Sequence, residues 1–142
     1  MPFFAHHSRE QLRHLYVQSW RKYRSGAPLE PLEAQIAAVI AEHGEYVPLL
    51  ESPHALAREF TPEGARENPF LHMGLHLAIR EQVGTDRPSG IARIHESLCR
   101  RLGDAHAAEH AMIERLAEAL WEAQRAGRMP DEQQYLQRLR AL

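Results

Sequence analysis

Cysteine, lysine and long hydrophobic runs are scarce in this chain of 142 residues. Cys99 is the only cysteine, so an intramolecular disulfide is excluded and folding does not require an oxidising compartment. No hydrophobic run approaches the roughly 20 residues that a transmembrane helix needs. The N-terminal residues lack the charged segment and the apolar stretch that form a signal peptide. We therefore expect a cytoplasmic protein that makes no membrane contact.

An excess of positive charge is also missing. The chain has 17 Lys and Arg residues against 19 Asp and Glu residues, which gives a formal net charge of −2, whereas a dedicated nucleic-acid binder is normally basic. Basic and aromatic residues alternate near the N-terminus, a pattern that some single-strand-binding surfaces share. An amphipathic helix with Arg9, Arg13, Arg21, Lys22 and Arg24 in water explains it more simply. We expect no nucleic-acid partner.

Strand-like alternation and internal repeats are absent as well, and the length points to one domain over residues 1–142. Helix start and stop signals predict an all-α fold, a single-domain antiparallel helical bundle of about five to six helices. One long irregular connection, residues 44–67, interrupts it, with a short turn of helix expected after Ser52. The expected helices cover residues 8–24, 31–43, 69–83, 89–102, 104–126 and a short segment after residue 130.

Capping residues set most of these boundaries. Ser8 with Gln11 has the spacing of a capping box. Asn68 followed by Pro69 is a strong helix start, and Asp104 is a second candidate N-cap. We expect Gly44, Gly103 and Gly127 to end helices in the left-handed conformation.

Histidine, by contrast, is abundant, with 10 residues in the chain. His72 and His76 lie four residues apart at the start of the most hydrophobic predicted helix, and His106 and His110 repeat this spacing at the start of another. Residues four apart share one helix face, so each pair could chelate an ion. In an up-down bundle these two helices run parallel, which brings both pairs to the same end, and an antiparallel second helix adds His43 there.

Imidazole is a good ligand for zinc, iron, copper and nickel. The sequence therefore predicts a transition-metal site, most simply for iron or zinc, formed by His72, His76, His106 and His110. Glu109 and Glu114 are candidate carboxylates close to the ion, and His43 is a further candidate, although a capping role on the surface is the simplest interpretation of its place near a helix end. The pattern specifies no reaction. Hydrogen-bonded core histidines without metal are the alternative for each pair.

The sequence matches two known metal-binding motifs, and each match covers only a few residues. His106-x-x-Glu109-His110 matches the inverted zinc-peptidase motif, but too little chain follows it to form a peptidase domain. The pairs also have the helix-borne spacing of hemerythrin-like di-iron bundles, whose C-terminal ligands are missing because no histidine follows His110.

The amino-acid sequences of three longer stretches resemble a small bacterial family classified as a domain of unknown function, number 1841. These stretches are NPFLHMGLHLAIREQ, HAAEHAMIERLAEALWEAQRAG and PDEQQYLQRL. The resemblance implies a single-domain bacterial protein and carries no activity with it. The preponderance of Arg and Ala over lysine also agrees with a GC-rich bacterial source.

A metal-free interaction module is the alternative to a metal site. In that interpretation, Leu120 and Trp121 and the C-terminal residues Tyr135 to Leu139 would contact a protein partner, which remains unidentified, or a second copy in a homodimer.

Overall fold

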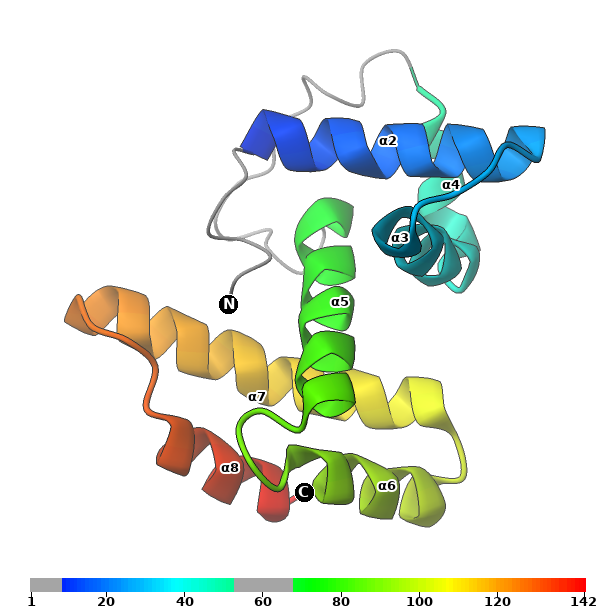
Figure 1. Ribbon diagram of the computed structural model, residues 1–142. Coiled ribbons are helices and arrows are strands. Elements are labelled where there is room, and N and C mark those ends of the chain that lie inside the picture. Colours follow the sequence, from blue (N-terminus) through cyan, green and yellow to red (C-terminus); the bar gives the residue numbers. More distant parts are fainter. Residues whose placement is uncertain (1–8, 53–67) are drawn as a thin grey trace. The chain divides into compact units, whose positions relative to one another are not determined.

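The computed structural model describes residues 9–52 and 68–142, and the described residues form helices and no strands (Figure 1). The predicted all-α class is confirmed, and the described ranges contain seven α-helices and one short 3-10 helix where the sequence predicted five to six helices. Ser8 and the helical turn expected after Ser52 lie outside the described residues. The helices are α2 (Arg9–Ser25), α3 (Pro31–Ala41), η1 (Gly44–Tyr46), α4 (Val47–Leu50), α5 (Pro69–Thr85), α6 (Ile91–Leu102), α7 (Ala105–Ala126) and α8 (Glu132–Arg140).

The chain forms two compact units, Met1–Leu77 and Ala78–Leu142, and we describe each by itself. Helix α5 contributes its first part to the first unit and its second part to the second. The single domain over residues 1–142 stays a prediction. None of the helices in the described ranges has the length and apolar character needed to cross a membrane.

The core of the first unit is formed where α2, α3, α4 and the start of α5 bring their hydrophobic side chains together. Tyr16 and Phe70 stack with their ring centroids 5.9 Å apart. The ring nitrogen of Trp20 donates a hydrogen bond of 3.1 Å to Glu51 Oε1, which anchors the residue just after α4 to α2. The buried core residues are Tyr16, Trp20, Ile36, Val39, Ile40, Leu50, Phe70, Met73 and Leu77.

Arg13 departs from the expectation that the basic residues of α2 lie in water. Its side chain is buried, and its guanidinium lies 4.7 Å from the centroid of the Phe70 ring. Stacking a guanidinium on an aromatic face stabilises the cation, because the face of the ring is electron-rich. The amphipathic interpretation holds for the exposed Arg21 and Arg24 and is wrong for Arg13.

The end of α3 differs from the predicted boundary. The helix ends at Ala41, and Gly44 begins the 3-10 helix η1 instead of ending α3 in the left-handed conformation. The chain turns tightly here, with the Tyr46 N–H donating to the His43 carbonyl over 2.9 Å. Gly103 and Gly127 do adopt left-handed conformations at the ends of α6 and α7, as predicted.

Glu33 ties the start of α3 to α2 and gives a pH-dependent prediction. Its carboxylate accepts hydrogen bonds from Lys22 Nζ and from the Glu30 N–H, both 2.8 Å long. The Lys22 hydrogen bond, followed by the Glu30 one, lowers the pKa of this carboxyl below its ordinary 4.5. A lowered folded-state pKa contributes stability that is present above the unfolded value and lost as pH falls through the folded one.

We therefore expect Glu33→Gln to lower the melting temperature at pH 7 slightly, by about 1–3 °C, as for a partly exposed ion pair. Below about pH 4.5 the difference between the two proteins should shrink, because protonation removes the same interaction from the natural chain. Melting curves between about pH 3 and 7, a range that spans the ordinary carboxyl pKa of about 4.5, measure this difference in melting temperature. A constant difference across that range would contradict the assignment.

The second unit contains three successive helices, α6, α7 and α8, together with the end of α5. Figure 1 shows α7 returning along α6 and α8 returning along α7. Asp104 and Asp131 cap α7 and α8 by accepting the N–H groups of His106 and Gln134. The hydroxyl of Tyr135 donates a 2.7 Å hydrogen bond to Gln82 Oε1, which joins α8 to α5 in the interior of the unit.

Candidate metal centre

Helix α5 positions His72 and His76 in its first turns. The Asn68 side chain accepts the N–H groups of Phe70 and Leu71, over 3.1 and 3.3 Å, so this helix start is capped as predicted. His72 is half-buried and His76 is fully buried. Because they lie four residues apart on a rigid helix, their rings meet, with centroids 4.7 Å apart.

His43 reaches the same place from the end of α3, within the first unit. Its side chain is only 2% exposed, so the expected position on the surface is wrong, although the ring does contact a carbonyl in the last turn of α3. Nδ1 lies 2.8 Å from the Val39 carbonyl oxygen. A carbonyl can only accept, so Nδ1 carries the proton, and in the neutral ring Nε2 then presents its lone pair. Backbone anchoring of this kind fixes the tautomer and the ring orientation of metal-binding histidines.

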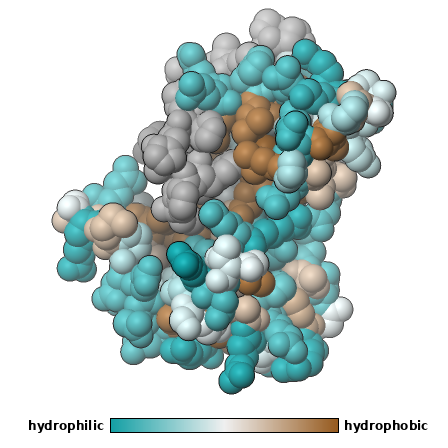
Figure 2. All heavy atoms as spheres, in the orientation of Figure 1, coloured by the Kyte–Doolittle hydropathy of each residue, from teal (hydrophilic) through white to brown (hydrophobic). Residues whose placement is uncertain are grey.

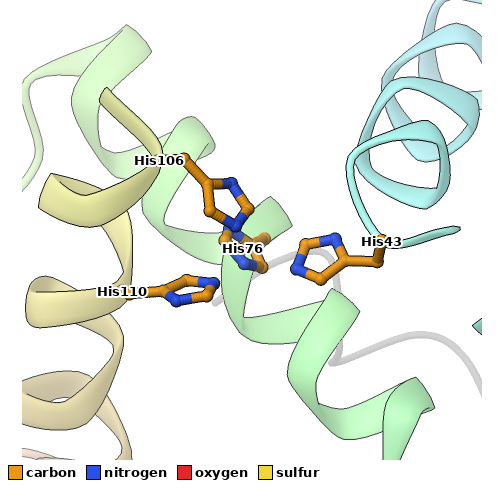
Figure 3. Close-up of side chains that lie close together, drawn as sticks. All are labelled: His43, His76, His106 and His110. Carbon is orange, nitrogen blue, oxygen red and sulfur yellow. The ribbon is translucent and has the colours of Figure 1, made fainter. Parts of the chain in front are cut away.

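The Nε2 atoms of His43 and His76 both lie close to the Nε2 atom of His72. His72 Nε2 lies 3.2 Å from His43 Nε2 and 3.1 Å from His76 Nε2. The His43 and His76 rings are also in contact, with centroids 4.6 Å apart and a ligand nitrogen of each within 4.8 Å of the other. Figure 3 shows His43 following α3 and His76 on α5. The structure thus joins one predicted pair to the additional candidate His43.

A single hydrogen bond does not account for both contacts of His72 Nε2. A ring nitrogen has one in-plane position, which holds either a proton or a lone pair. His72 Nε2 can therefore form an in-plane hydrogen bond with only one of its two close nitrogen neighbours. A cation placed between the three atoms accepts a lone pair from each of them, which is the arrangement that three converging imidazole nitrogens favour.

Tyr46 is a neighbour of this cluster that the sequence patterns did not indicate. Its ring lies parallel to that of His43, with centroids 5.3 Å apart and an interplanar angle of 2°, and it approaches His72 edge-on at 6.1 Å. Burial, followed by the nearby charge of Glu45, raises the pKa of the half-buried Tyr46 phenol. The spacing of three from His43 would have indicated this contact only if the 3-10 turn η1 had been foreseen.

The second histidine pair lies on the first turns of α7, in the second unit. The rings of His106 and His110 are 4.2 Å apart between centroids, and each offers a nitrogen within 4.8 Å of the other. Figure 3 shows the two rings projecting from successive turns of α7. His106 is half-buried and His110 is exposed. The two rings therefore lie side by side on one face of α7, as their spacing of four residues predicts, and metal ligation by this pair stays a prediction.

The two candidate carboxylates are placed differently. Both Glu109 oxygens lie 3.1 Å from Arg80 Nε, and the Glu109 side chain is 10% exposed. Glu114 is on the outside of α7, 71% exposed, with its nearest cation, Arg115, at 3.9 Å. Arg80 was not anticipated, although it follows His76 by four residues and so continues the same face of α5. Metal ligation by Glu109 and Glu114 stays a prediction.

Comparison with known proteins identifies the family. The sequence profile of the family described as a domain of unknown function (DUF1841) matches residues 8–141. Searches of curated proteins and of solved structures gave no match. The match covers nearly the whole chain, including all five histidines discussed above, and the protein belongs to the DUF1841 family.

Proposed function

We propose that this protein binds one transition-metal ion, zinc or iron, through the Nε2 atoms of His43, His72 and His76. The observation that carries the proposal is the pair of Nε2 separations, 3.2 and 3.1 Å. Nitrogens about 2.1 Å from one ion are about 3.0 Å apart at right angles and about 3.4 Å apart in a tetrahedron. Both separations from His72 fall between these limits, which supports one ion bound by His72 together with His43 and His76.

The donor set agrees with this choice of metal. Three neutral imidazoles suit borderline ions such as zinc and ferrous iron. Three protein ligands also leave a position at which the ion can bind water, as in catalytic zinc sites. His106 and His110, with Glu109 and Glu114 near them, remain predicted ligands on their sequence spacing, and metal loading of their variants decides whether they bind this ion or a separate one. The proposal names a binding function and leaves the reaction open.

Metal analysis after loading tests the proposal. The purified chain is incubated with Zn²⁺ or Fe²⁺, desalted and measured by elemental analysis. We expect about one equivalent in the natural chain, and much less in His72→Gln and His76→Gln variants, because each loses one ligand nitrogen. His14→Gln, which replaces an exposed histidine on α2, is the matched control and should load normally. Less than about a tenth of an equivalent in the natural chain after loading would overturn the proposal.

The second pair is tested in the same experiment. If His106 and His110 ligate the same ion, their replacement by Gln lowers the affinity while the stoichiometry of the natural chain stays at about one. Two equivalents, one of which disappears with the His106 and His110 variants, would show two separate sites instead. Circular dichroism confirms that each variant is helical before loading is compared.

A protein-contact role is a second candidate, because Trp121 is 57% exposed on α7 and Arg125 stacks on it at 4.7 Å. Large aromatic residues are enriched at interfaces. By contrast, Tyr135, Leu136 and Leu139 are buried within their own unit and offer no surface to a partner. Sedimentation of the natural chain and of Trp121→Ala distinguishes a homodimer through this surface from a monomer.

A further inference from the structure

A groove of about 710 Å³ lies in the second unit, along α6 and beside the end of α8. Its volume is in the range of about 300–1,000 Å³ that is typical of small-molecule sites. Hydrophilic residues predominate on the part of the surface where α6 and α8 lie in Figure 2. The lining residues are Asp86, Ser89, Gly90, Ala92, Arg93, Ile94, Glu96, Ser97, Leu98, Arg101, Leu139 and Arg140.

Two of the lining arginines belong to the first turn of α6 or lie beside it. Arg140 comes from α8, and its Nη2 lies 3.4 Å from the position that a Cβ on Gly90 would occupy. Arg93 follows Gly90 by three residues on α6 itself. Arg101, at the other end of the groove, donates a 2.6 Å hydrogen bond to the Leu142 main-chain oxygen. Arg93 and Arg140 are therefore the lining arginines at the N-terminal end of α6, where the helix dipole is positive and where Asp86 caps the helix.

The carboxylates that line the groove are already engaged. Asp86 Oδ1 accepts the N–H groups of Gly90 and Ala92, over 3.1 and 3.0 Å. Glu96 accepts a 3.1 Å hydrogen bond from Arg100, which is not a lining residue. Within residues 9–52 and 68–142, Arg93 and Arg140 have no ion-pair partner within 4.0 Å. Two unneutralised guanidinium groups at one end of a groove favour an anionic ligand.

We propose that this groove binds a small organic phosphate monoester, with the phosphate between Arg93 and Arg140. A phosphate dianion offers oxygens to two guanidinium forks at once, which a single carboxylate does less completely. The remainder of the ligand lies toward Ile94 and Leu98, the hydrophobic residues of α6 that line the groove. The inference is independent of the metal centre, since none of the residues that line the groove is a candidate metal ligand.

Amide NMR titrations with phenyl phosphate and with inorganic phosphate test this inference at constant ionic strength. We expect saturable shifts of the α6 amides and of the end of α8, with phenyl phosphate binding about tenfold more tightly than inorganic phosphate because of its ring. No saturable shift up to about 10 mM phenyl phosphate, a concentration well above a millimolar Kd, would overturn the proposal. Equal binding of the two ligands would overturn the role of the hydrophobic residues.

Charge-removing variants test the two arginines. Arg93 and Arg140 are exposed, so Arg93→Gln and Arg140→Gln should fold normally, and each should weaken phenyl phosphate binding at least about tenfold. Arg125→Gln removes the same charge from an exposed position outside the groove and should bind like the natural chain. An equal loss in Arg125→Gln would show that net charge, and not the groove, governs binding, and would overturn the proposal.

Discussion

If the proposed ion is bound, its removal should lower the melting temperature of the natural chain by about 10 °C. A ligand that binds only the folded state stabilises it by about 4 kcal/mol when its free concentration is a thousand times its Kd. For a chain of this length, 1 kcal/mol corresponds to roughly 2–4 °C. His43 lies beyond the end of α3 and the other two proposed ligands lie on α5, so the ion would join segments that are distant in the sequence. Thermal melts of the Zn²⁺-loaded protein with and without EDTA measure the effect.

The controls separate ligation from packing. His76 is fully buried, so His76→Gln will also change the melting temperature through packing alone. The informative quantity is therefore the difference between the melts with and without EDTA, which should vanish in His72→Gln and His76→Gln and persist in His14→Gln. A natural chain whose melting temperature is the same with and without EDTA after loading would contradict a site formed by these histidines.

Replacing Arg80 by Met should destabilise the protein by about 2–3 kcal/mol. Both Glu109 oxygens accept from Arg80 Nε, and the carboxylate is almost completely shielded from water. Loss of the cation leaves a mostly buried negative charge with weaker compensation, and breaking buried pairs costs about 3–5 kcal/mol. We expect less than this upper range because the Arg80 side chain is 28% exposed. Urea unfolding of the two proteins measures the difference.

A double variant identifies the cause of that loss. In Arg80→Met with Glu109→Met no charge is buried, so most of the stability should return. Arg80→Lys keeps the charge without the guanidinium geometry and should be intermediate. If Arg80→Met were as stable as the natural chain, the ion pair between Arg80 and Glu109 would not stabilise the packing of α7 against α5.

Helix boundaries set by local chemistry were predictable from the sequence. The caps at Asn68 and Asp104 and the left-handed glycines at Gly103 and Gly127 act on backbone groups a few residues away, so they need no knowledge of the fold. Gly44 is likewise a glycine at a predicted helix end, but it begins a 3-10 turn instead. Packing of Tyr46 on His43 accompanies this turn, and a contact of this kind overrides a local preference.

The candidate site also has one part that the sequence determined and another part that only the fold decided. By itself the sequence determined that His72 and His76, and likewise His106 and His110, share a helix face, because a spacing of four is one turn of any α-helix. Only the tertiary structure decided that His43 is buried beside His72, with its Nε2 atom close to that of His72. It also decided that Arg80 donates hydrogen bonds to both oxygens of Glu109. These contacts join residues 29 positions apart. Their geometry follows from how the helices pack, which a periodic pattern along one helix does not contain.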